Sequence, residues 1–264
     1  MAIAEREHAA VEVVDLSTTS LRELNQRLHD LRADSESASA DSELRQSPKP
    51  PPSGGARARG TLGPRHFRVV NPNGAHAVAC GLDADLEVEV EGHVGYYCAG
   101  MNKLATVHVH GNASTGIAEN MMSGRVVVDG NVSQSAGATG RGGLLVVRGN
   151  ASSRCGISMK GIDIVVGGSV GHMSAFMAQT GSLVVCGDAG EALGDSIYEA
   201  RLYVRGSVGS LGADCIEKEL RPEHVEQLRG LLESAEIDAD PAEFRRYGSA
   251  RQLYNFHVDH AGSY

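Results

Sequence analysis

The most regular feature of the chain is a pattern of apolar and polar positions that repeats every 19 residues between Leu86 and Cys215. Each repeat is centred on a glycine, and these repeat glycines are Gly92, Gly111, Gly130, Gly149, Gly168, Gly187 and Gly206. Aliphatic residues stand four and two positions before each glycine, and a valine or alanine stands two positions after it. This alternation has the period of two that is typical of a β-strand with one buried face. The pattern therefore predicts one strand per repeat, with these three positions facing inward.

A unit of this length cannot bury its own apolar face, so successive units must stack on one another. Stacked strands lie about 4.8 Å apart, which gives seven units a length of about 35 Å. The predicted fold is an all-β main domain, a right-handed single-stranded parallel β-helix of about seven 19-residue coils. The left-handed hexapeptide helix, with about 18 residues per coil, has no place for a nineteenth residue.

Two further positions of the repeat predict corners. The residue after each repeat glycine is His93, Asn112, Asn131, Asn150, Ser169, Asp188 or Ser207. Asn and Asp tolerate the left-handed backbone of a sharp corner, so we expect that conformation there. Seven positions after each glycine stands only alanine or glycine, which predicts a second corner or a crowded inward site.

The chain before the repeat divides into two segments. Residues 1–32 predict a short strand followed by a helix, whose start is indicated by the capping-box spacing of Ser20 and Glu23. The helix has one apolar stripe, so we expect it to dock onto another part of the protein. The apolar stripe of that helix is Leu21, Leu24, Leu28 and Leu31. Residues 33–62 are rich in Ser, Pro and Gly and predict a disordered linker.

The β-helix domain is predicted over residues 63–215, and residues 216–264 form a helical C-terminal cap and tail. Pro222 fits the first turn of a helix. The apolar stripe of this second helix is Val225, Leu228, Leu231 and Leu232. Because the open ends of a solenoid expose strand edges, we expect both terminal segments to cap it and to dock partner subunits.

An apolar row runs along the predicted outer face, three positions before each repeat glycine. Its members are Glu89, His108, Val127, Val146, Val165, Val184 and Tyr203. An exposed apolar strip usually marks a protein contact. The alternative is that residues 1–32 or 216–264 cover it.

Composition narrows the functional classes. The net charge of −9 argues against a nucleic-acid or anionic-membrane partner. Aromatic residues make up 4% of the chain, which predicts a narrow core of small aliphatic side chains. The sequence has neither a signal-peptide pattern nor an apolar run long enough to span a membrane, so we expect a cytoplasmic protein.

Few residues carry a chemical pattern. Cys80, Cys98, Cys155, Cys186 and Cys215 are widely spaced and are expected to be free thiols. The glycines are not followed by helices, which argues against a nucleotide-binding loop. Three glycosylation sequons begin at Asn112, Asn131 and Asn150, and their shared repeat phase explains them as corner residues.

Histidines are the remaining candidates for chemistry. His108 and His110 flank Val109 and are expected to point outward, and we expect no carboxylate at a matching spacing. His172, His257 and His260 are scattered. Solvated histidines are therefore the favoured interpretation, and we expect no catalytic, cofactor-binding or metal-binding residue on this chain.

The repeat resembles a known family. The strings Val109-His110-Gly111-Asn112-Ala113, Val128-Asp129-Gly130-Asn131-Val132 and Val147-Arg148-Gly149-Asn150-Ala151 resemble the GXGXG repeats in the C-terminal domain of the glutamate synthase large subunit. Ser158-Met159-Lys160-Gly161 is similar to a step that ends coils in that domain. The segment from Phe244 to Phe256 resembles the tail of stand-alone β-helix subunits, such as that of N-methylglutamate synthase.

This resemblance implies a hetero-oligomeric complex. The chain would hold a glutaminase-like (class II amidotransferase) subunit against a flavin-dependent glutamate synthase-like subunit. FMN and an iron–sulfur cluster would belong to the synthase subunit, with no cofactor on this chain. The implied reaction of the complex converts glutamate and methylamine to N-methylglutamate and ammonia. The alternatives are the similar β-helix subunit of a formylmethanofuran dehydrogenase-type complex and a free-standing β-helix enzyme or adhesin.

Overall fold

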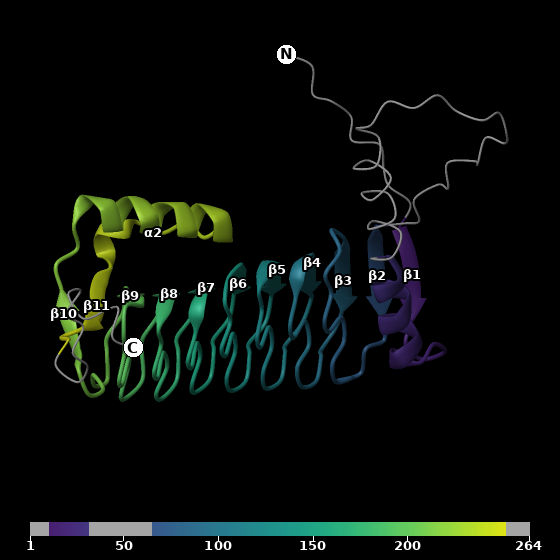
Figure 1. Cartoon of the computed structure of the whole chain (residues 1–264), viewed down its shortest axis with the longest axis horizontal. Helices are drawn as coiled ribbons and strands as arrows, with labels where there is room; N and C mark the ends of the chain where they lie inside the picture. The colour runs from purple at the N-terminus through teal and green to yellow at the C-terminus, as the bar shows by residue number, and fades with distance from the viewer. Residues whose placement is uncertain (1–10, 32–64, 252–264) are drawn as a thin grey trace, which may run out of the picture.

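The computed structural model describes residues 11–31 and 65–251 as a rod-shaped β-solenoid (Figure 1). Its strands form one sheet in the order β1-β2-β3-β4-β5-β6-β7-β8-β9-β11-β10. The strands are β1 (Val11–Asp15), β2 (His66–Val70), β3 (Glu87–Glu91), β4 (Lys103–Val109), β5 (Ser123–Val128), β6 (Leu144–Val147), β7 (Lys160–Val166), β8 (Thr180–Val185), β9 (Arg201–Val204), β10 (Cys215–Lys218) and β11 (Arg245–Ser249). A helix spans residues 21–31, followed much later by α2 (Pro222–Ala235) and the short η1 (Pro241–Glu243).

The predicted inward ladder is confirmed. Strands β1 to β9 pair in parallel, and Val107 on β4 stacks between Val88 on β3 and Val126 on β5. The positions four and two residues before each repeat glycine are fully buried or nearly so. Single-residue bridges join the third inward position from coil to coil, beginning with Val94 and Ala113. Each coil thus places its small aliphatic side chains in one continuous core.

The predicted left-handed corner after each repeat glycine is wrong. Residues with positive φ are found elsewhere, and neither Asn112 nor Asn131 is among them. Their side chains instead accept hydrogen bonds between coils: Asn131 N–H donates to Asn112 Oδ1 (2.7 Å), and Asn150 N–H donates to Asn131 Oδ1 (2.8 Å). The side chains of Asn, Ser, Asp and His can each place an acceptor atom within reach of the N–H group on the next coil, which explains why these residue types occur at this position.

The repeat glycines are needed for close approach between coils. A Cβ on Gly149 would lie 2.6 Å from Asn131 Oδ1 and 2.7 Å from the carbonyl oxygen of Gly130. The same backbone oxygen accepts a hydrogen bond from Gly149 N–H at 3.1 Å. A side chain at this position would therefore separate the two coils.

The second predicted corner, seven residues after the repeat glycine, adopts the left-handed conformation in the first six coils but not at Ala213 of the seventh. Ala99 and Gly137 have φ of 52° and 67°, and a Cβ on Gly137 would lie 2.6 Å from Ile164 Cδ1. In the same six coils the residues five and nine positions after the glycine are left-handed too, as at Tyr97 and Met101. Their N–H groups bond to an adjacent coil, for example Met101 to the Glu119 carbonyl at 2.7 Å. Contacts between coils therefore hold a conformation that non-glycine residues rarely adopt.

The helix over residues 21–31 closes the N-terminal end of the core. Leu24 and Leu28 are buried in the main core cluster, with Leu21 and Leu31 packed against it. The Asn25 side chain bonds to the backbone it faces, through Ala77 O at 2.9 Å and Ala79 N at 3.0 Å. The predicted stripe is confirmed, and Glu23 N–H donates to Ser20 Oγ as the N-cap pattern requires.

The C-terminal segment ends the parallel stack in a way that the repeat does not predict. Strand β11 runs antiparallel and lies between β9 and β10. Helix α2 then lies along the side of the solenoid toward β6 (Figure 1). Its Leu228, Leu232 and Ala235 pack on the outer row of Val127, Val146, Val165, Val184 and Tyr203. The alternative that residues 216–264 cover the apolar row is therefore correct.

The stripe of α2 differs from the prediction at two positions. Leu228 and Leu232 are buried as expected, but Val225 and Leu231 are only partly buried. His224 and Ala235 complete the buried face.

In residues 11–31 and 65–251, none of the helices has the length and apolar character that a membrane crossing requires. The predicted linker at residues 33–62 lies outside the described residues.

Candidate functional site

A histidine pair stands on the outer face at the end of β4. Val107 and Val109 point into the core and are fully buried, so His108 and His110 between and after them point outward, as predicted. Each histidine side chain is 31% exposed. The two rings lie against each other with centroids 4.0 Å apart.

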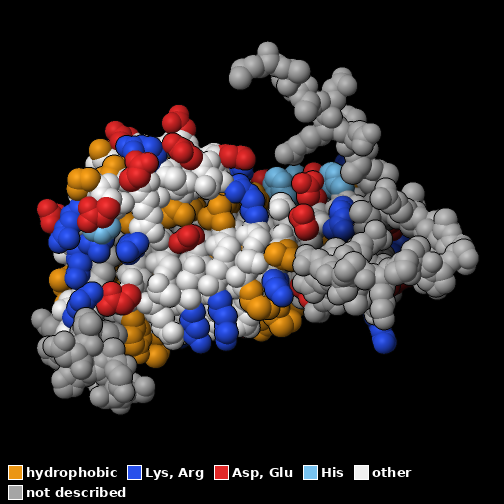
Figure 2. All heavy atoms as spheres, turned by 45° about the horizontal axis from the view of Figure 1, so that its top comes forward, with side chains coloured by type: hydrophobic (Ala, Val, Ile, Leu, Met, Phe, Trp, Pro, Cys, Tyr) orange, Lys and Arg blue, Asp and Glu red, His pale blue; other side chains and the backbone are white. Residues whose placement is uncertain are grey.

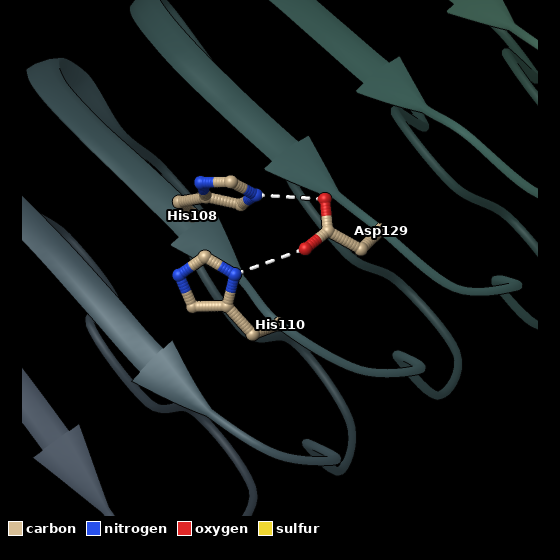
Figure 3. Close-up of side chains that lie close together, drawn as sticks. All are labelled: His108, His110 and Asp129. Atoms are coloured by element: carbon tan, nitrogen blue, oxygen red, sulfur yellow. Dashed lines mark hydrogen bonds and ion pairs between the residues drawn. The ribbon is translucent and has the colours of Figure 1, made fainter.

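A carboxylate on the next coil joins the pair (Figure 3). Asp129 follows β5 and stands 19 residues after His110, so it occupies the same position one coil further on. His108 Nε2 lies 2.8 Å from Asp129 Oδ1, and His110 Nδ1 lies 2.9 Å from Asp129 Oδ2. The expectation that no carboxylate lies at a matching spacing is therefore wrong. We call His108, His110 and Asp129 the histidine cluster.

Electrostatics favour the ionised carboxylate in this cluster. Partial burial by itself would raise the pKa of Asp129, but hydrogen bonds and charge interactions with His108 and His110 outweigh it and lower the pKa. Arg148 Nε lies 3.6 Å from Asp129 Oδ1 on the far side, and its guanidinium also bonds Glu236 at 3.0 Å.

Two more carboxylates flank the cluster on the preceding coil. Glu89 and Glu91 of β3 lie close enough to His110 for their ligand atoms to share one ion. Glu89 also lies 3.5 Å from His66 Nε2, and Glu91 lies 2.9 Å from Arg68 Nε. Figure 2 shows histidine and acidic side chains gathered on the surface toward the N-terminal coils.

A second polar site lies where α2 meets β7, β8 and β9. It is a cleft of about 350 Å³ whose lining includes Asp163, Ser182, Arg201 and Gln227. Gln227 joins helix and sheet, because it accepts from Arg201 at 2.8 Å and donates to Ser182 at 3.2 Å. Burial raises the pKa of Asp163 more than Ser182 and Arg201 lower it. These contacts anchor α2 to the sheet.

Five large apolar side chains are exposed on the coils between β3 and β5. Between 46% and 50% of the surface of Tyr96, Tyr97, Met101, Leu104 and Met122 is exposed. We call these five residues the apolar patch. A group of large apolar side chains at this exposure is typical of a protein contact.

The cysteines are free thiols in the described residues, as predicted. Burial raises the pKa of both Cys98 and Cys155 to about 12, so neither is a reactive thiolate.

His172 is exposed on its own coil, and His257 and His260 lie outside the described residues. The period of the repeat was the signal that could have located Asp129 beside the histidines.

Comparison with known proteins finds a close relative. The chain is 58% identical over 253 residues to protein GlxC of Rhizobium meliloti (strain 1021). The match covers 96% of this chain and 99% of that protein. No family model matches the chain.

Proposed function

Since the chain belongs to the same protein family as protein GlxC, we propose that it is a non-catalytic structural subunit of a glutamate synthase-like enzyme complex. The observation that carries this proposal is the stacked solenoid of 19-residue coils, whose repeats resemble the C-terminal domain of the glutamate synthase large subunit. The described residues form the solenoid and its caps, and in this proposal the other parts of such an enzyme are separate polypeptides.

The architecture suits a spacer between two active sites. Every coil from β3 to β9 is hydrogen-bonded to its neighbours along the strands, through the side chains that follow the repeat glycines, and at the left-handed corners. Such a rod bends little, and sites that share an intermediate must keep a fixed separation. The helix over residues 21–31 and the pair β10–β11 close its two ends. These closures leave the sides of the rod for partners.

The partners that fit this role are a glutaminase-like subunit and a flavin-dependent synthase subunit. The apolar patch supports one such contact, because its five side chains are half exposed on a fold that buries most of its aliphatic residues. FMN and an iron–sulfur cluster would lie in the synthase subunit. Our specific proposal is N-methylglutamate synthase, which forms N-methylglutamate and ammonia from glutamate and methylamine.

Purification of the tagged full chain from its native host tests the proposal. We expect a yellow-brown complex that contains a glutaminase-like and a flavin-binding polypeptide and that makes N-methylglutamate only when methylamine is supplied. A partner that contains molybdenum or tungsten would favour the formylmethanofuran dehydrogenase-type alternative. A colourless chain recovered alone would contradict a role in either complex.

A further inference from the structure

We propose that His108, His110 and Asp129 form a binding site for a divalent first-row transition-metal ion, of which Zn²⁺ is the representative. Imidazole nitrogen and carboxylate oxygen are ligands that suit Zn²⁺, Cu²⁺ and Ni²⁺. The ligand atoms of the three residues all lie within 4.8 Å of one another. Three protein ligands leave at least one coordination position open to water or to a group from another molecule.

The spacing of the ligand atoms is close to what a metal requires. Zn²⁺ bonds of about 2.0–2.1 Å in a tetrahedron place neighbouring ligand atoms about 3.4 Å apart. The present contacts are 2.8 Å from His108 Nε2 to Asp129 Oδ1 and 2.9 Å from His110 Nδ1 to Asp129 Oδ2. Small rotations of the side chains would admit the ion in place of the hydrogen bonds. The backbone need not move.

The backbone holds these residues in place before any ion binds. His108 pairs with Val127 in the β4–β5 ladder. His110 N–H donates to the Val90 carbonyl at 2.9 Å, and Asp129 N–H donates to the Val109 carbonyl at 3.0 Å. The ligands therefore stand on two adjacent coils whose separation the solenoid sets. Preorganisation of this kind lowers the entropic cost of assembling a metal site.

Charge around the site also favours a cation. Two neutral imidazoles and one carboxylate leave a divalent ion with one uncompensated positive charge. Glu89 and Glu91 on the preceding coil supply negative charge on the other side of His110. Arg148 opposes binding at Asp129, but its guanidinium is shared with Glu236. Arg68 similarly reduces the contribution of Glu91.

The place of the cluster on the rod keeps it accessible. On later coils the position of His108 is taken by valine or tyrosine, which α2 covers. Helix α2 ends at Ala235, whose carbonyl accepts from Arg148 at 3.4 Å. The histidine cluster lies beyond this end, and its three side chains are 31–39% exposed.

Calorimetric titration of ZnCl₂ into untagged, chelator-treated full-length chain tests the site, with the absorption spectrum of bound Co²⁺ as a second readout. We expect one ion per chain for wild type and for the control His172→Ala. Loss of even an outer-shell partner commonly weakens binding 10- to 100-fold, so His108→Ala, His110→Ala and Asp129→Asn should each weaken binding by at least about tenfold.

Circular dichroism would establish that each variant keeps its fold. Binding that persists unchanged in the double variant His108→Ala/His110→Ala would overturn the proposal. So would the absence of stoichiometric binding by wild type, or an equal loss of affinity in the His172→Ala control. The readouts concern the single chain, so they are independent of the proposed complex.

Discussion

Asn131 Oδ1 accepts a hydrogen bond from Asn150 N–H at 2.8 Å, which joins one coil of the solenoid to the next through a side chain. The same link recurs 19 residues earlier between Asn112 Oδ1 and Asn131 N–H. It continues through Ser169 and Asp188 to Ser207. The backbone N–H group at this position of each coil therefore donates to a side chain of the coil before it.

Removal of one side-chain acceptor from this series of hydrogen bonds should destabilise the fold. Asn131→Ala leaves Asn150 N–H without its partner, and we expect a loss of about 1–2 kcal/mol in the free energy of unfolding. Asn131→Asp keeps an acceptor oxygen, and the chain already uses Asp188 at the equivalent position. Urea denaturation of both variants should therefore show a clear loss for alanine and a smaller one for aspartate. Equal losses would argue against the hydrogen bond as the cause.

Two glycine-to-alanine changes should act in opposite directions. In Gly149→Ala the new Cβ would lie 2.7 Å from the Gly130 carbonyl oxygen, so the coils must separate and the melting temperature should fall by several degrees. Gly230 lies in α2, and a Cβ there would meet nothing within 4 Å. Gly230→Ala should therefore stabilise the chain slightly, by up to about 1 kcal/mol. Similar melting temperatures for the two variants would contradict the close approach of the coils.

A charge in the inward ladder should be severely destabilising. Val147 is fully buried, and Val147→Asp places an unpaired carboxylate in the core at a cost of several kcal/mol, roughly 3–5. The matched control is Val13→Asp on β1, where the valine is 60% exposed. Thermal unfolding followed by circular dichroism should separate the two. A wild-type melting temperature for Val147→Asp would show that this position does not face inward.

Asp163 should reduce stability at neutral pH. Burial raises its folded pKa above the unfolded value, so folding disfavours the ionised form wherever the unfolded chain is ionised. This penalty is full above the folded pKa and decreases as the pH falls through it toward the unfolded value of about 3.9. Asp163→Asn should therefore be more stable than wild type at pH 7, with the difference disappearing near pH 4.

The control for this prediction is Asp188→Asn. Hydrogen bonds from the backbone and side chain of Ser207 lower the pKa of Asp188, so its contribution has the opposite sign. The ionised carboxylate stabilises the fold above its unfolded pKa, and this contribution is lost as the pH falls through the folded pKa. Asp188→Asn should therefore show no gain at pH 7. A gain for both variants would indicate a general effect of reduced negative charge.

The apolar patch should matter for assembly rather than for folding. Met101 is 48% exposed and left-handed, a conformation that Asp tolerates, so Met101→Asp should leave the melting temperature nearly unchanged. Fewer partner subunits should be recovered when the tagged variant is purified from the native host. Gln134→Asp adds the same charge at an exposed polar position two coils further on and should leave recovery intact. Equal recovery for both variants would exclude the patch as a docking surface.

The sequence by itself determined the solenoid and its inward faces. A strand alternates sides with every residue, so a 19-residue period with valines at fixed positions permits one stacking register. The same period contains the proximity of Asp129 to His110, because stacked coils bring residues 19 apart together, although the prediction of no matching carboxylate missed it. The role of the corner asparagines did not follow from propensity, since both a left-handed turn and a side-chain acceptor favour Asn.

Only the tertiary structure decided how the C-terminal segment folds back. The apolar stripe of α2 and the apolar row of Val127, Val146, Val165, Val184 and Tyr203 are each visible in the sequence, but nothing local pairs them. Helix α2 stands between β10 and β11 in the chain, and these two strands pair antiparallel at the end of the sheet, so both ends of the segment that contains α2 are held there. That pairing joins residues far apart in sequence through backbone hydrogen bonds, which any residues could make. For this reason the end of α2, and with it the partial exposure of the histidine cluster, was settled by packing rather than by pattern.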